Sequence, residues 1–305
     1  MYVRRRLGAG QRLITEVRQP HEEEWRFAEP DAALGYVSPF APEWEAARAA
    51  EHAAEGDVVL PFQPLSFRDF LLYEEHNVGV ARGWVRRFRP AVARLATAFE
   101  FTTRRTFPLF RPRRLWYQQP IYYMGNAATV VPSGTPVRGP SYTTALDYEL
   151  ELAFVLNAPL LDASPAEAEQ AIGAFAVLCD FSARDVQVAE MGSNFGPQKA
   201  KHFLTSLSAT AVTAGDILPR WRELAATVEI NGEVVAKPDP THARWTLGEM
   251  LAHASSGERL LPGEVFATGT YVNGSGIEIN RWLRPGDTLR LAVDQVGAIE
   301  HRIMA

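Results

Sequence analysis

The clearest pattern along the chain is an alternation of apolar and acidic residues from Leu146 to Leu156, which read LDYELELAFVL. Successive side chains of a strand point to opposite faces, so this pattern predicts a strand with one apolar and one acidic face. The acidic face carries Asp147, Glu149 and Glu151, whose charges repel one another when ionised. Either solvent or a hard divalent cation such as Mg²⁺ or Ca²⁺ would compensate that repulsion, and the pattern alone leaves both explanations open.

The second half of the chain shows further strand patterns, separated by turns and short helices. Residues 164–187 predict a capped helix that runs into a buried strand. Asn231-Gly232 predicts the turn of a β-hairpin, and residues 246–257 predict another short helix. Strand patterns punctuated by Pro-Gly and Gly-Asp turns fill the remainder. We therefore predict an α+β fold that is mostly β: a mixed β-sheet roll or sandwich with short peripheral helices.

The first sixty residues differ from this pattern, because they are mostly polar and irregular. Within them, the stretch from Pro42 to Gly56 predicts a short helix closed by the glycine. The change in pattern falls between residues 57 and 65. We predict a small N-terminal segment of residues 1–62 and a larger domain of residues 63–305.

A helical pattern begins at Ser66, a residue suited to an N-cap. The pattern places Asp69, Tyr73 and His76 four and three positions apart, so that all three share one helical face. A histidine in such a place is either an ordinary surface residue or part of a site, and the local sequence leaves both possibilities open.

Composition narrows the class of protein. The chain has 305 residues, of which 47% are hydrophobic, and a formal net charge of -5, which argues against a nucleic-acid partner. No apolar run approaches the length of about 18 residues that a membrane span needs, and the N-terminus lacks the apolar core of a signal peptide. The single cysteine, Cys179, forms no internal disulfide and is expected in the core. We expect a cytoplasmic enzyme or binding protein without a membrane partner.

Lysine is rare in this sequence, which has only Lys199, Lys201 and Lys237 among 31 basic residues. Two of the three lie together, where a choice of lysine over arginine suggests that a compact point charge is needed. We therefore expect one of these two lysines to be a site residue.

Four segments, taken in order, resemble the fumarylacetoacetate hydrolase family: LDYELEL, DFSARDVQ, KAKHFLTS and LLPGEVFATGT. The most specific feature is an E-x-E strand followed about 30 positions later by D-x-S-A-R-D-x-Q. The resemblance covers roughly residues 65 to 300. It implies that the fold is the family's β-sheet roll or sandwich, and it favours a cation over solvent beside the acidic strand.

The resemblance implies a set of site residues. Three of them match the family's metal ligands: Glu149, Glu151 and Asp180, with Asp69 as a further ligand. The metal implied is Mg²⁺, with Mn²⁺ or Ca²⁺ as substitutes. Those that match catalytic groups are the general base His76, its orienting partner Glu278, and the charge-stabilising Arg184, Gln187 and Lys201. Tyr123 and Thr270 match substrate contacts of the family, and Tyr73 and Arg82 are further candidates for this role that lie near the family's positions.

Three positions depart from the family pattern. The family's substrate tyrosine lies two residues after the aspartate, where this chain has Leu71, and the stretch from His76 to Arg82 is shorter than usual. Met191 stands where a tyrosine is expected, so we expect a different substrate tail. Asp147 lies outside the E-x-E pair and is expected to form an ion pair or to bind water, and Lys199 is expected to be the exposed neighbour of Lys201.

The function implied is divalent-metal-dependent hydrolysis of a C–C bond in a 1,3-dicarbonyl or acylpyruvate-like substrate. The alternative is a metal-dependent decarboxylase, isomerase or dehydratase that acts on a 2-oxo acid through a metal-bound enolate. A third possibility is a metal-binding scaffold without catalysis. In each enzymatic case the partner is a small oxo-acid or diketone, and the resemblance suggests a homodimer.

Overall fold

A twelve-stranded sheet forms the centre of the protein, and the computed structural model describes all 305 residues. Nine strands follow edge to edge in the order β3-β2-β1-β13-β10-β9-β16-β5-β6, while β12, β7 and β4 attach beside this path. The bounds are β1 (Tyr2–Gly8), β2 (Arg12–Arg18), β3 (Arg26–Phe27), β4 (Val58–Val59), β5 (Phe67–Phe70), β6 (Tyr122–Gly125), β7 (Val130–Pro132), β9 (Leu150–Leu156), β10 (Ile172–Asp180), β12 (Thr205–Leu207), β13 (Thr210–Thr213) and β16 (Val265–Ala267).

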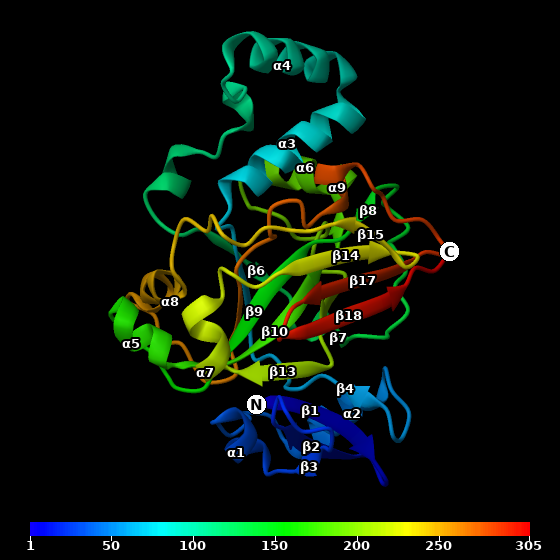
Figure 1. The fold of residues 1–305 in the computed structure, drawn as a ribbon, viewed down its shortest axis with the longest axis vertical. Coiled ribbons are helices and arrows are strands. Elements are labelled where there is room, and N and C mark those ends of the chain that lie inside the picture. The colour runs from blue at the N-terminus through cyan, green and yellow to red at the C-terminus, as the bar shows by residue number, and fades with distance from the viewer.

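A four-stranded antiparallel sheet lies beside β9 and β10 as a second layer (Figure 1). Its strands are β14 (Ala226–Ile230), β15 (Glu233–Ala236), β17 (Thr288–Val293) and β18 (Gly297–Arg302). A two-stranded ladder pairs β8 (Leu146–Asp147) with β11 (Ser182–Ala183). The predicted hairpin is confirmed: β14 and β15 are joined at Asn231 and Gly232, which both have positive φ, as a tight hairpin turn requires. The predicted mixed, mostly β architecture is also confirmed.

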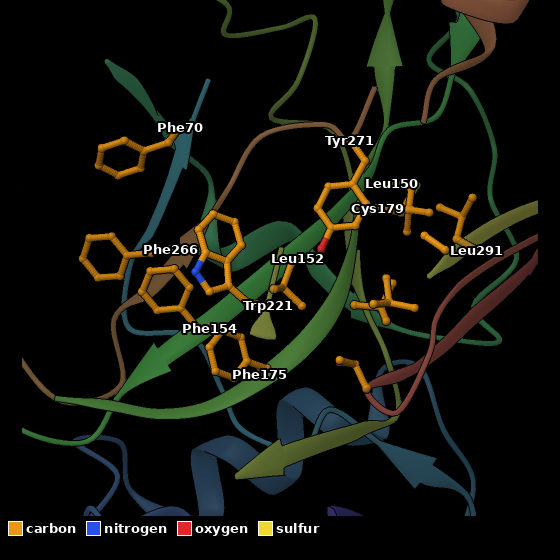
Figure 2. Close-up of a cluster of buried hydrophobic side chains, with 14 of the residues drawn as sticks. Phe70, Leu150, Leu152, Phe154, Phe175, Cys179, Trp221, Phe266, Tyr271 and Leu291 are labelled. Atoms are coloured by element: carbon orange, nitrogen blue, oxygen red, sulfur yellow. The ribbon is translucent and has the colours of Figure 1, made fainter. Parts of the chain in front are cut away.

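Strand β9 alternates between two cores on opposite faces of the central sheet. Leu150, Leu152 and Phe154 belong to the larger core, which Figure 2 shows together with Leu291 of the second sheet. Ala153 and Val155 belong to the smaller core on the other face. The strand predicted over Leu146–Leu156 is present but interrupted after β8, and it is buried on both faces. Solvent therefore does not explain its carboxylates.

The helices lie at the edges of the sheets. Their bounds are α1 (Pro30–Leu34), α2 (Pro42–Ala50), α3 (Glu74–Phe88), α4 (Pro90–Thr103), α5 (Pro165–Gln170), α6 (Arg184–Gly192), α7 (Ala214–Ile217), α8 (Leu247–Ser255) and α9 (Gly276–Ile279). The predicted cap of α5 is confirmed, because Ser164 forms a capping box, and Thr246 forms a second one at the start of α8. None of the helices has both the length and the apolar character that crossing a bilayer demands.

The N-terminal residues extend the central sheet, because β1 pairs antiparallel with β13. Their place at one end of the molecule is visible in blue in Figure 1. The predicted helix over Pro42–Gly56 is too long: α2 ends at Ala50, and Gly56 instead takes a positive φ in the turn that leads to β4. The division into residues 1–62 and 63–305 stays a prediction.

The helix predicted from Ser66 is wrong at its start. Residues 67–70 form β5, which pairs with β16 on one side and β6 on the other, and all four are buried. Tertiary pairing therefore overrides the helical spacing. The helix α3 begins only at Glu74, so Asp69 lies on a strand and His76 in the first turn of the helix.

Two helices are longer than the short peripheral helices predicted from the sequence. Helix α3 has 15 residues and α4 has 14, and α4 is absent from the sequence-based prediction. Figure 1 shows α3 over one end of the central sheet, with α4 beyond it. We call α3, α4 and the short turn 108–110 after them the helical cap.

Candidate active site

A pocket of about 510 Å³ lies between the central strands and the helical cap. Twenty-seven residues line it, and fifteen of them are hydrophobic. Its polar residues gather where β5, β9 and the start of α6 meet, and include Asp69, Glu149, Glu151 and Arg184. The pocket therefore has a charged end on the central strands and mostly apolar walls elsewhere, part of which the helical cap contributes.

Three buried carboxylates come together at the charged end. Asp69 lies on β5, Glu151 on β9 and Asp180 at the end of β10, and one oxygen of each lies within 4.8 Å of the others. Strands β9 and β10 are hydrogen-bonded neighbours, with Leu178 opposite Glu151, so the sheet itself sets the spacing of these groups. The arrangement brings together three of the four residues predicted as metal ligands.

The donor set fits a hard divalent cation. Glu151 Oε2 is buried and has no hydrogen-bond partner, a state that costs free energy unless a ligand compensates it. Burial, and then the neighbouring carboxylates, raise the pKa values of Asp69 and Glu151 well above their ordinary range. An all-oxygen set of this kind suits Mg²⁺, Mn²⁺ or Ca²⁺, which would offset the mutual repulsion.

Glu149, the fourth predicted ligand, has a different environment. Its Oε1 accepts a hydrogen bond from Arg184 Nη2 at 2.8 Å, and its Oε2 accepts bonds from Lys201 Nζ and, at 3.2 Å, from Ser182 Oγ. Burial would raise the pKa of Glu149, but the two cations outweigh burial and lower it well below its ordinary range. Glu149 is therefore ionised and already balanced by protein charges.

Arg184 is fully buried at the start of α6, where it joins two acids. Its Nε donates to Asp147 and its Nη2 to Glu149, each at 2.8 Å, and its Nη1 donates to the Gln187 side chain at 2.9 Å. The ion pair expected for Asp147 is confirmed. Arg184 and Gln187 also line the pocket.

Lys201 is the buried member of the lysine pair. Its Nζ contacts Glu149 and lies 2.6 Å from Asp180 Oδ2, and the charges of these acids outweigh burial and raise its pKa. Lys199 is exposed, as expected. A compact ammonium group between two carboxylates explains why this position carries lysine in an arginine-rich chain.

His76 lies between two carboxylates. Its Nδ1 is 2.9 Å from Glu278 Oε2, and its Nε2 is 3.4 Å from Glu149 Oε1. Glu278 is itself held by the backbone N–H of Asn273 and by the hydroxyl and N–H of Ser275. Burial would lower the pKa of His76, but the two carboxylates dominate and raise it to about 9. The structure thus brings together the predicted base and its predicted orienting acid.

Two glycines of α3 allow this contact. A Cβ at Gly79 would lie 2.9 Å from the side chain of Glu278, and one at Gly83 would lie 2.1 Å from the carbonyl oxygen of Ile277. Both glycines share the helical face of His76, at spacings of three and four residues. Their missing side chains let α3 approach α9 closely enough for His76 to reach Glu278.

Two of the four predicted substrate contacts line the pocket. The Tyr123 hydroxyl donates to Asp180 at 2.6 Å, and the Thr270 hydroxyl donates to Glu151 at 3.1 Å. The other two do not. Tyr73 is buried in the larger core against Tyr271, and Arg82 pairs with Glu100 on the surface of the cap.

Sequence reasoning missed the apolar wall of the pocket. Helix α3 contributes Val80, Trp84 and Val85, and α4 contributes Val92. Met191 of α6, singled out in the sequence, also lines the pocket and is 54% exposed. Apolar residues at spacings of three to five along α3 were a usable signal, but nothing in them shows that they face a pocket.

The chain is similar in sequence to known proteins. A family model described as "Fumarylacetoacetate (FAA) hydrolase C-terminal" matches residues 102–304. Oxaloacetate tautomerase fahd2 of Xenopus laevis is 28% identical over 191 residues, 61% of this chain and 59% of that protein. A fumarylacetoacetase of Oryza sativa subsp. japonica is 30% identical over 200 residues, 51% of this chain and 46% of that protein. The chain thus spans about half of the length of these relatives.

A solved structure shows the same fold. Fumarylpyruvate hydrolase from Pseudomonas aeruginosa, in complex with Mn²⁺ and pyruvate, has a TM-score of 0.60 with this chain and is 20% identical to it. The match covers 83% of this chain and 97% of that one. At this identity the likeness concerns the fold, and it shows that a relative with this fold holds a divalent metal ion.

Proposed function

The chain belongs to the fumarylacetoacetate hydrolase family, and from this premise we propose that it is a metal-dependent hydrolase of C–C bonds in 1,3-dicarbonyl or acylpyruvate-like substrates. The observation that carries the proposal is the His76–Glu278 pair, at 2.9 Å, in the same pocket as the carboxylates Asp69 and Glu151. Hydrolysis needs an activated water as well as a means of stabilising negative charge, and this pocket contains residues suited to both tasks.

Asp69, Glu151 and Asp180 would hold the metal ion, with Mg²⁺ as the proposed cofactor and Mn²⁺ or Ca²⁺ as substitutes. The unpartnered oxygen of Glu151 and the spacing within 4.8 Å support this set. Glu149 is available as a fourth ligand only if one of its oxygens leaves its cationic partners. When bound, the ion would supply Lewis acidity at a substrate carbonyl, and its positive charge would lower the pKa of the nearby His76 imidazole.

His76 acts as the general base in this proposal. Glu278 fixes the ring through Nδ1, and Nε2, which faces Glu149 Oε1 at 3.4 Å, takes a proton from water once the imidazole is neutral. The resulting hydroxide attacks the carbonyl carbon distal to the substrate's carboxylate. Ser275 and Asn273 hydrogen-bond to Glu278 and keep the Glu278 carboxylate in place while His76 gains and loses the proton.

Lys201, Arg184 and Gln187 stabilise the negative charge that develops on the substrate. All three line the pocket, and removal of one such donor commonly costs ~3 kcal/mol of transition-state stabilisation. The C–C bond then breaks, and the electron pair leaves as an enolate that is protonated to a ketone. One water is consumed, and the products are a carboxylic acid and a pyruvate-like oxo acid.

The test is an assay of metal-stripped protein titrated with Mg²⁺ and with Mn²⁺. Loss of the enol absorbance of acylpyruvates and 1,3-diketones reports turnover, and mass spectrometry identifies the products. Metal-dependent appearance of an acid and a pyruvate-like product supports the proposal. Release of CO₂, or a product with the mass of the substrate, contradicts hydrolysis and leaves the metal set to be tested separately.

A second candidate is a tautomerase or isomerase that acts on a 2-oxo acid at the same site. The similarity to an oxaloacetate tautomerase over 61% of the chain favours it. Such a reaction moves a proton without consuming water, so it uses His76 as an acid–base group only. The product mass in the same assay separates the two candidates.

We also propose that the protein is a cytoplasmic homodimer. Sedimentation of the full chain tests the dimer: the proposal expects twice the mass of one chain, and a monomer at micromolar concentration contradicts it. Fractionation of the source cells tests the location.

A further inference from the structure

We propose that the pocket selects substrates whose tail, the part remote from the reacting carbonyls, is neutral and apolar. This inference rests on the proposed function, because it places the reacting carbonyls of the substrate at the charged end of the pocket. The remainder of the substrate then extends toward the helical cap, where the walls differ in character from the charged end.

The walls toward the cap are apolar. Helix α3, helix α4 and the residues after them contribute the side chains that line this region: Val80, Trp84, Val85, Val92, Phe107 and Leu109. Val188 and Met191 of α6 also line the pocket. Binding of an alkyl or aryl group against apolar walls is favourable, because the group leaves water.

The positively charged side chains of the pocket and the cap lie at the charged end or on the exposed surface, and not on the apolar walls. The basic residues that line the pocket are His76, Arg184 and Lys201, and each is already paired with buried carboxylates at the charged end. Arginine stands at ten positions between residues 82 and 114, all exposed, and none of these ten lines the pocket. The segment from residue 82 to residue 114 is therefore strongly basic on its exposed surface, while the side chains that it contributes to the pocket are apolar.

A substrate tail that ends in a carboxylate would be at a disadvantage here. The carboxylate would lose water on entry and meet apolar side chains rather than a free cation, which makes its burial costly. The indole Nε1 of Trp84 is buried without a partner, but it offers one neutral donor and not a charge. A tail of methylene groups or an aromatic ring meets no such penalty.

The experiment compares matched 2-oxo acids of equal chain length, one with a methyl end and one with a carboxylate end. Their dissociation constants for the Mn²⁺-loaded full chain are measured by titration calorimetry. The methyl-ended acid is expected to bind at least about tenfold more tightly, and each added methylene to gain roughly fourfold while the chain fits the pocket. Equal binding, or tighter binding of the diacid, overturns the inference.

Two variants locate the tail. Leu109→Arg places a cation at a position that lines the pocket and is 80% exposed, so folding should tolerate it. Leu95→Arg adds the same charge on α4 at a position that is 69% exposed and outside the pocket. Leu109→Arg should narrow the preference for the methyl-ended acid by about tenfold, and Leu95→Arg should leave it unchanged. A preference that both variants narrow equally, or that neither narrows, contradicts placement of the tail against the cap.

Failure of this inference and failure of the proposed function give different results. Cleavage of acylpyruvates with a preference for diacids would support the hydrolase proposal and contradict the preference for an apolar tail. Tighter binding of methyl-ended acids without cleavage of any acylpyruvate would support the preference for an apolar tail and contradict the hydrolase proposal.

Discussion

The two ends of the pocket are built in different ways. The charged end consists of buried groups on and beside the central strands β5, β9 and β10, and Glu149, Asp180 and Lys201 are fixed by several polar contacts each. The helical cap has only a small core of its own, formed by Val78, Ala96 and Phe110. It exposes large apolar side chains, such as Leu95 and Phe101.

This difference separates two tasks. Groups that carry out chemistry must be held within a fraction of an ångström, which the hydrogen-bonded central strands provide. Walls that recognise a tail need only shape and apolar character, which peripheral helices provide and which can vary without disturbing the strands. The proposal therefore places the reaction at the charged end and substrate selection at the cap.

The largest effect is expected from Glu151→Gln. The change removes the charge of a carboxylate whose Oε2 has no protein partner, so Mn²⁺ affinity should fall by about a hundredfold or more, and metal-dependent turnover should disappear. Calorimetric titration of metal-stripped protein measures the affinity. Glu223→Gln, at an exposed position away from the pocket, is the matched control and should behave as the unmodified protein. Unchanged affinity and activity in Glu151→Gln would remove the metal assignment.

The next largest effect is expected from His76→Ala. Turnover should fall by about a hundredfold to ten-thousandfold, because the general base is lost, while Mn²⁺ affinity changes little, because the imidazole is not a ligand in the proposed set. Initial rates and metal titrations on the same preparation measure the two quantities. Unaltered turnover would exclude His76 as the base, and a parallel loss of metal affinity would make it a ligand.

The contrast between core and cap predicts unequal effects on stability. Phe154→Ala removes a fully buried ring from the larger core and should lower the free energy of unfolding by ~3–5 kcal/mol. Phe101→Ala on α4, where the ring is 70% exposed, should change it by less than ~0.5 kcal/mol. Denaturant unfolding measures both. Similar losses of unfolding free energy in the two variants would show that side chains of the cap contribute as much to stability as those of β9.

The smallest effect concerns acid stability and His301, which is buried between Thr135 and Ser206. Burial lowers its pKa from 6.5 to about 4. The unfolded chain therefore binds more protons than the folded one between these values, so stability falls as pH drops from 6.5 toward 4, by up to about 3 kcal/mol. His301→Gln should lack this part of the pH dependence in denaturant unfolding. An identical pH profile in the variant would mean that His301 does not contribute.

The charged end could be predicted from the sequence because its signals are local. The alternation around Glu149 and Glu151 marks a strand with an acidic face, and the segment from Asp180 to Gln187 supplies the facing groups. The solvent explanation failed because both faces of β9 are buried, a property set by strands distant in the sequence.

The positions of Asp69 and Tyr73 could not be predicted in this way. The pairing of Phe67 with Val265, nearly two hundred positions apart, makes a strand of a segment whose spacing is helical. The same pairing places Tyr73 in the larger core rather than on a helical face shared with Asp69 and His76. The cap is likewise a tertiary feature, because apolar spacing along α3 does not distinguish a wall of a pocket from an ordinary core face.

The most direct test of hydrolysis is cleavage of an acylpyruvate by the Mn²⁺-loaded protein in water enriched in the heavy oxygen isotope. If His76 activates water for attack on the carbonyl, one heavy oxygen appears in the carboxylic acid product and none is added to the pyruvate carboxylate. A product pair without heavy oxygen in the acid, or conversion of the substrate without cleavage, would contradict the hydrolase assignment.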